Sequence, residues 1–149
     1  MTTPSKVNPR KIFAPGAVVF REGEAGDCAF IVESGRIDIV KQDGKDQRRL
    51  GSVEPGGIFG EMALVDDQPR MATALAATKT SLVLVSAATF RTKIDAVDPF
   101  IGALLRIFNS NVRQLQNEIT ELRLNIKQLV AEKEAFAAAR VAASPQGQG

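Results

Sequence analysis

The chain of 149 residues contains no histidine, no tryptophan, no tyrosine and only one cysteine, Cys28. Without histidine, a zinc site that uses imidazole, a histidine-ligated haem and a Cys–His nucleophile pair are all excluded. A single cysteine forms no internal disulfide, so we expect a reducing cytoplasmic compartment and a packing role for Cys28. We therefore predict that the protein uses neither a metal ion nor a cofactor.

Neither sign of charge dominates, because 19 Lys and Arg against 17 Asp and Glu give a net charge of +2. A dedicated nucleic-acid binder usually carries a strong basic excess, so the composition argues against direct DNA binding. Long apolar runs are also missing, and stretches such as Ser81–Val85 are far too short to cross a bilayer. The N-terminal segment MTTPSKVNPR has no apolar run, and we expect no signal peptide and no membrane contact.

Glycine is rare in the second half of the chain, since nine of the twelve glycines lie between Gly16 and Gly60. Short apolar stretches with strand character alternate with these glycines, and this pattern predicts a sandwich or small barrel rather than a parallel α/β sheet. The predicted strands are residues 17–21, 29–32, 36–40, 49–50, 58–59, 72–77 and 81–85.

Beyond residue 86 the pattern becomes helical. Residues 87–94 are typical of a short helix, and Asp98 followed by Pro99 is a favourable start for a second, long helix. We therefore divide the chain into an N-terminal arm (1–11), a β-rich domain (12–97), a long helix (98–140) and a disordered tail (141–149).

Apolar residues recur along the long helix in alternating steps of four and three. β-branched residues at most a positions and leucine at most d positions favour a parallel two-stranded coiled coil, so we predict a homodimer. The alternative is an amphipathic helix packed on its own domain, but a helix of about 64 Å would extend beyond a domain of about 30–35 Å. The seam comprises Leu105, Phe108, Val112, Leu115, Ile119, Leu122, Ile126 and Leu129.

The segment between the predicted strands 58–59 and 72–77 contains the candidate site. Gly60 allows a sharp turn, Glu61–Leu64 is about one helical turn, and Arg70 follows the break in that helix. Free backbone N–H groups of such a turn, one arginine and one acid suit a ligand that carries both phosphate and hydroxyl groups. The alternative is a capped turn with a surface ion pair between Arg70 and Glu61. We interpret Asp66 and Asp67 as a solvated turn rather than part of a cation site.

The segments FGEMAL (residues 59–64) and PRMAT (residues 69–73) resemble the phosphate-binding cassette of cyclic nucleotide-binding domains. This family includes protein kinase A regulatory subunits and the catabolite activator protein, and the resemblance extends over about residues 12–115. It implies a mainly β fold with α-helices, namely a double-stranded β-helix or jelly-roll barrel, followed here by the coiled-coil helix. Four further matching segments are residues 13–16, 20–23, 31–36 and 55–60.

The resemblance also implies roles for individual residues. Arg70 would pair with the cyclic phosphate, Glu61 would accept a hydrogen bond from the ribose 2′-hydroxyl, and Gly60 would let the sugar approach the backbone. Backbone N–H groups that support the phosphate would come from Met62, Ala63 and Ala72. Met71 stands where relatives selective for cyclic GMP often carry Thr or Ser, so the resemblance favours cyclic AMP. Gln116 and Asn117 fall near the region that covers the base in catabolite activator-like dimers.

These features predict a non-enzymatic, bacterial-type cyclic AMP sensor that signals through its dimeric helix to a separate protein effector. Only nine residues follow Arg140, too few for a helix-turn-helix domain, so we expect no attached output domain. Two alternatives stay open: a coiled-coil scaffold with a degenerate, non-binding barrel, and a DNA-associated regulator that uses the coil for recognition.

Overall fold

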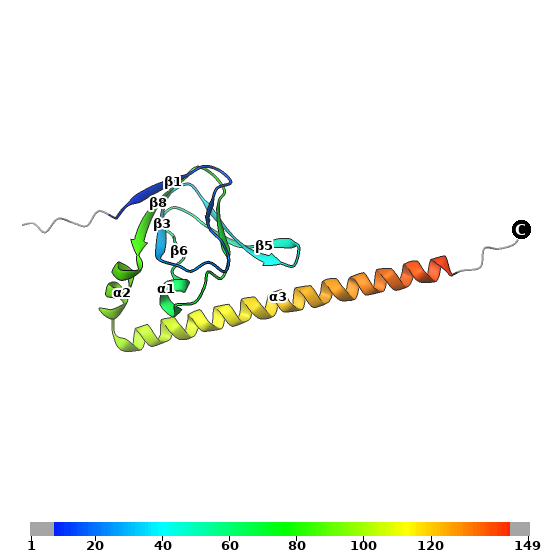
Figure 1. The fold of residues 1–149 in the computed structure, drawn as a ribbon. Coiled ribbons are helices and arrows are strands. Elements are labelled where there is room, and N and C mark those ends of the chain that lie inside the picture. The colour runs from blue at the N-terminus through cyan, green and yellow to red at the C-terminus, as the bar shows by residue number, and fades with distance from the viewer. Residues whose placement is uncertain (1–7, 144–149) are drawn as a thin grey trace, which may run out of the picture. The chain divides into compact units, whose positions relative to one another are not determined.

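The computed structural model of the chain describes residues 8–143 (Figure 1). The chain divides into two compact units, Met1–Arg113 and Gln114–Gly149. Of the residues described, those of the first unit include every strand, the first two helices and the start of the last helix, and those of the second belong to the later part of the last helix. None of the helices described is both long and apolar enough to cross a membrane.

The eight strands form two antiparallel four-stranded sheets. The first sheet has the order β1 (Arg10–Phe13), β8 (Thr80–Ser86), β3 (Cys28–Ser34) and β6 (Ile58–Phe59). The second has the order β2 (Val18–Phe20), β7 (Thr73–Ala76), β4 (Ile37–Asp43) and β5 (Asp46–Val53). Over residues 8–143 the strands thus form the two sheets of a jelly-roll sandwich and no closed barrel. The mainly β class and the jelly roll are confirmed.

The core lies between the two sheets, and its residues follow the alternation of the strands. Ala74 and Ala76 on β7 are fully buried while their neighbours are half-buried, as expected for a strand with one core face. Phe30 and Phe59 stack with ring centroids 5.2 Å apart, and Phe20 lies 5.9 Å from each of them. The buried cluster comprises Phe13, Phe30, Val32, Ile37, Phe59, Ala74, Ala76 and Leu82.

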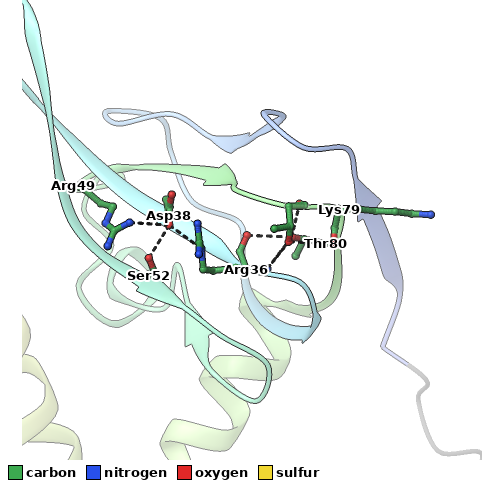
Figure 2. Close-up of polar contacts among 7 residues, drawn as sticks. Arg36, Asp38, Arg49, Ser52, Lys79 and Thr80 are labelled. Atoms are coloured by element: carbon green, nitrogen blue, oxygen red, sulfur yellow. Dashed lines mark hydrogen bonds and ion pairs between the residues drawn. The ribbon is translucent and has the colours of Figure 1, made fainter.

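The turn between β3 and β4 is fixed by the buried hydroxyl of Thr80 (Figure 2). The backbone N–H of Arg36 donates to Thr80 Oγ1 over 3.2 Å. Gly35 has a φ of +88°, and a Cβ there would lie 2.4 Å from the carbonyl oxygen of Lys79. Only glycine allows the chain to pass so close to Lys79 and Thr80 in this conformation.

Side chains add a polar cluster where β4 pairs with β5, also drawn in Figure 2. Ser52 Oγ donates to Asp38 Oδ1 over 2.7 Å, and the same oxygen lies 3.5 Å from Arg36 Nε and 3.9 Å from Arg49 Nη1. Because both arginines are largely exposed, these ion pairs contribute little to the free energy of unfolding. The cluster therefore acts mainly as a local cross-strand contact.

The described part of the chain also has three helices: α1 (Met62–Asp66), α2 (Ala87–Asp95) and α3 (Pro99–Ala142). The side chain of Ser86 caps α2 by accepting from Thr89 N over 3.2 Å. Asp98 Oδ1 accepts from Phe100 N over 2.8 Å, so the predicted start of the long helix is confirmed. Helix α3 continues to Ala142, two residues beyond the predicted end, and most of the predicted disordered tail lies outside the described residues. Strand β1 begins at Arg10, inside the segment predicted as an arm.

The apolar seam of α3 is exposed in both units of the chain. In the first unit Leu105, Phe108 and Val112 are all exposed. In the second unit the exposed seam residues are Leu115, Ile119, Leu122, Ile126 and Leu129. The packed-helix alternative requires the seam to be buried against the sheets of the same chain. Within the first unit the seam is exposed instead.

Candidate functional site

A cavity of about 210 Å³ opens beside α1 and the segment that follows it. All seven residues predicted to bind ligand through the cassette line this cavity: Gly60, Glu61, Met62, Ala63, Arg70, Met71 and Ala72. Five further lining residues, not predicted from the sequence, come from the sheets: Phe20, Ile39, Val53, Ile58 and Phe59. Glu61 and Arg70 are thus the two charged residues of the wall, and the lining residues from the strands are all apolar.

The turn into α1 depends on Gly60. Its φ is +76°, and a Cβ there would lie 2.8 Å from Arg70 Nη1 and 3.2 Å from Phe20. In the helix that follows, Leu64 N and Val65 N both donate to the carbonyl oxygen of Glu61 over 3.0 Å. The N–H groups of Met62 and Ala63 precede these bonds, in the first turn, where a helix provides no backbone acceptor. They are the donors that this turn can offer to a ligand in the cavity.

Arg70 is the charged group of the cavity wall, and only 5% of it is exposed. Its Nη1 donates to the carbonyl of Gly60 over 2.6 Å, and its Nη2 donates to the carbonyl of Cys28 over 2.7 Å. Its Cζ lies 4.1 Å from the centroid of the Phe20 ring, a cation–π contact. The alternative of a surface ion pair between Arg70 and Glu61 is therefore wrong, because Arg70 is buried and bonded to two backbone carbonyls.

Burial perturbs the ionisable groups around Arg70. Burial lowers the pKa of Arg70, although the guanidinium stays protonated at any physiological pH. Burial also raises the pKa of the Glu61 carboxyl, and the charge of Arg70 opposes that rise in part. Cys28 has its thiol pKa raised to about 11, first by burial and then by its hydrogen bond with Asp27. Cys28 is accordingly an unreactive thiol at neutral pH.

One donor of the buried arginine has no acceptor. Arg70 Nε is buried and has no hydrogen-bond partner among the described residues. A buried cation with an unsatisfied N–H is costly in free energy, and an anionic ligand oxygen is the group that satisfies both the charge and the donor. The cavity therefore suits a ligand with an anionic group and a flat, apolar part that contacts the strand residues.

The cavity wall at Met71 is held by a buried lysine. The ammonium of Lys41, itself 6% exposed, donates to the carbonyl of Met71 over 3.0 Å and to Glu22 Oε1 over 3.1 Å. Lys41 thus ties β4 to the residue directly after Arg70. Within residues 8–143, no three His, Cys, Asp or Glu side chains come together in a group that could hold a metal ion.

Gln116 and Asn117, the residues predicted to cover the base, belong to the second unit. There the carbonyl of Gln116 accepts from Thr120 Oγ1 over 2.9 Å. Their contact with a ligand stays a prediction.

Asp66 is where the sequence interpretation was wrong. The sequence predicts that it is part of a solvated turn, but its carboxylate accepts hydrogen bonds from Asn109 Nδ2 (2.6 Å) and from two nitrogens of Arg113. Asp67, its neighbour, does stay exposed and pairs with Arg91 over 2.6 Å. Because 43 and 47 residues separate Asp66 from its partners, no local pattern could have revealed these contacts.

Comparison with known proteins agrees with the family resemblance of the sequence. The family model "Cyclic nucleotide-binding domain" matches residues 10–96. The cAMP-dependent protein kinase regulatory subunit of Eremothecium gossypii is 38% identical over 81 residues, which are 54% of this chain and 17% of that protein. A cyclic nucleotide-gated potassium channel of Rhizobium etli is 38% identical over 96 residues, which are 64% of this chain and 25% of the channel.

Among solved structures, the cAMP-bound form of the EAL enzyme Bd1971 has a TM-score of 0.71 at 28% identity and covers 90% of this chain and 34% of that one. The cGMP-bound form of the same enzyme gives a TM-score of 0.69. The chain therefore spans about a third or less of each of these relatives.

Proposed function

Because the chain belongs to the cyclic nucleotide-binding domain family, we propose that its cavity binds cyclic AMP and that the protein is a non-enzymatic sensor of this ligand. The observation that carries the proposal is the buried guanidinium of Arg70, which lines the cavity and keeps one donor, Nε, without an acceptor. A cyclic phosphate carries one negative charge and two exocyclic oxygens, so it matches this group in charge and in hydrogen bonding.

The remaining cassette residues then take complementary roles. The N–H groups of Met62, Ala63 and Ala72 surround the phosphate, while Glu61 accepts the hydrogen bond of the ribose 2′-hydroxyl. Gly60 keeps space for the sugar, since a side chain there would meet Arg70 and Phe20. The base contacts the apolar wall formed by residues such as Ile39, Val53 and Met71.

Met71 supports cyclic AMP over cyclic GMP, because its thioether offers no donor or strong acceptor to the polar edge of guanine. The cAMP-dependent kinase subunits among the relatives support the same preference. The EAL enzyme, which was solved with both nucleotides, makes the comparison of the two ligands a necessary part of the test.

We further propose that the protein acts as a parallel homodimer through the seam of α3 and transmits ligand binding to a separate protein effector in the cytoplasm. Support comes from the exposure of seam residues in both units, since an apolar stripe along a helix of 44 residues is stable in water only when a partner covers it. In this arrangement the coil needs no contact with DNA.

Isothermal titration calorimetry of the purified protein with cyclic AMP, cyclic GMP and acyclic 5′-AMP tests the binding function. We expect saturable binding of one cyclic AMP per chain, weaker binding of cyclic GMP and weakest binding of 5′-AMP, whose phosphate is not held in the cyclic geometry. Absence of binding by folded protein would overturn the sensor and leave the coiled-coil scaffold with a degenerate ligand site.

A further inference from the structure

The cassette is joined to the start of α3 by a polar cluster of three residues, Asp66, Asn109 and Arg113, which we call the clasp. All three lie in the first unit, where α1 lies beside α3 (Figure 1). Asn109 Nδ2 donates to Asp66 Oδ2 over 2.6 Å and to the carbonyl of Met62 over 3.1 Å. Arg113 donates to Asp66 through Nε and through Nη2, the latter over 3.0 Å.

Arg113 also contacts the other end of the turn that separates α1 from Arg70. Its Nη1 donates to the carbonyl of Pro69 over 3.0 Å, so a single guanidinium bridges Asp66 and Pro69. Between them Asp67 adopts a left-handed conformation with a φ of +51°, which a non-glycine residue rarely occupies without support. The bridge therefore links the last residue of α1 with the residue directly before Arg70.

The clasp includes a buried residue of α3, Asn109. Among residues 99–113, all of which the structure describes, only Gly102 and Asn109 are buried. The seam residues of this part of the helix point to solvent. A helix of only five residues such as α1 is unstable by itself, so its position depends on contacts such as these.

We infer that Asn109 and Arg113 are positioning residues for the ligand site, which hold the cassette in its binding geometry through Asp66 and Pro69 without touching the ligand. This inference rests on the proposed binding of cyclic AMP. None of the three clasp residues lines the cavity. Because coupling between two events is reciprocal, bound ligand also strengthens the clasp and so the attachment of residues 99–113 to the cassette. In this part of α3 Asn109 is buried while the seam residues Leu105, Phe108 and Val112 are exposed, so a dimer can form while the clasp is intact.

The test is a double-mutant cycle on cyclic AMP affinity, measured by calorimetry with Arg113→Ala, Asp66→Ala and the double variant. We expect each single variant to raise Kd about tenfold. The double variant should raise Kd by clearly less than the product of the two single effects, because both singles break the contact between Asp66 and Arg113, whereas the bonds of Arg113 to Pro69 and of Asp66 to Asn109 are each broken by one single only. Arg113→Lys should recover part of the affinity, since an ammonium keeps the charge but does not span Asp66 and Pro69 together.

Arg106→Ala is the matched control, because Arg106 lies on the same helix and makes no hydrogen bond with the cassette. Its Kd should equal that of the wild type. Thermal unfolding of ligand-free protein separates loss of positioning from loss of folding: the clasp variants and the control should unfold at similar temperatures. If folded Arg113→Ala binds cyclic AMP with unchanged affinity, or if the losses in the double variant are additive, the positioning role of the clasp is overturned. The proposed function would still hold in that case, provided that the wild type binds cyclic AMP. A wild type that binds no cyclic nucleotide would instead overturn the proposed function itself.

Discussion

The guanidinium of Arg70 lies on the face of the Phe20 ring, with 4.1 Å between Cζ and the ring centroid. Phe20 in turn belongs to the trio of rings with Phe30 and Phe59 in the core. The charged group of the site is therefore held by the aromatic core on one side and by the carbonyls of Gly60 and Cys28 on the other. A cation fixed in this way needs little rearrangement to meet an anion, which lowers the entropic cost of binding.

The first prediction concerns Arg70→Ala. Removing the guanidinium deletes the positive charge of the cavity wall, so Kd for cyclic AMP should rise at least tenfold, which corresponds to about 1.4 kcal/mol or more. Calorimetry measures the loss, and circular dichroism checks that the sheets are intact. Arg21→Ala is the control. It removes an exposed arginine that directly follows β2, and it should leave the Kd for cyclic AMP unchanged. Equal affinities of wild type and folded Arg70→Ala would contradict the assignment of the phosphate site.

The second prediction concerns selectivity and Met71→Thr. The carbonyl of Met71 is held by Lys41, so the side chain at this position starts from a fixed backbone on the cavity wall. A threonine hydroxyl there can hydrogen-bond guanine, and the ratio of the cyclic GMP and cyclic AMP dissociation constants should fall several-fold, a gain of about 1 kcal/mol. Competition binding with both nucleotides gives the ratio, and Met71→Val is the control without a hydroxyl. Identical ratios in the threonine and valine variants would place selectivity elsewhere.

The third prediction follows from the raised pKa of Glu61. Burial disfavours the charged carboxylate in the folded state, so the folded protein is most stable when Glu61 is protonated. This contribution to stability is fully present below the ordinary pKa of 4.5, and it is lost as the pH rises through the higher pKa of the folded state. Glu61→Gln has no charge to bury. The melting temperature of ligand-free Glu61→Gln should therefore exceed that of the wild type by an amount that grows as pH increases above 4.5.

The same substitution should weaken cyclic AMP binding, because an amide replaces the carboxylate that accepts the ribose hydroxyl. A loss of about 1–2 kcal/mol is expected for a hydrogen bond to a charged acceptor. Stability and affinity thus change in opposite directions. A melting difference that is constant between pH 4 and pH 8 would show that folding does not raise the pKa of Glu61.

The sequence was informative where local chemistry determines structure. The spacing of Gly60, Glu61 and Arg70 located the cassette, and Asp98 before Pro99 located the start of α3, because turns and caps depend on neighbouring residues. The aromatic wall was not predicted, since alternation indicates a strand but does not say which strands meet. Phe20, for example, contacts Arg70 only because β2 pairs with β7.

The contacts of Asp66 were missed for a related reason. An aspartate in a run with Asp67, Gln68 and Pro69 has the composition of a solvated turn, and nothing in that run indicates a partner more than forty residues away. Asn109 and Arg113 are spaced by four, as polar residues on any helix face can be. Their role depends on the packing of α3 beside α1 in the folded domain, which is a tertiary property.

The last prediction concerns the seam of α3. Ile119 and Leu122 are neighbouring a and d positions, 39% and 60% exposed in the single chain, and in a parallel dimer each would face its counterpart. Replacing both with Asp would place four carboxylates in that apolar interface, at a cost of several kcal/mol. Size exclusion with light scattering should report about 32 kDa for the wild type, twice the chain mass of 16.0 kDa, and a monomer for the variant. Glu118→Asp next to the seam is the control and should stay dimeric.

Because the sheets and the cavity belong to the first unit, the double variant should keep its cyclic AMP site. A wild-type monomer at tens of micromolar would contradict the dimer. A tetramer would agree with association through the seam but contradict the two-stranded coiled coil.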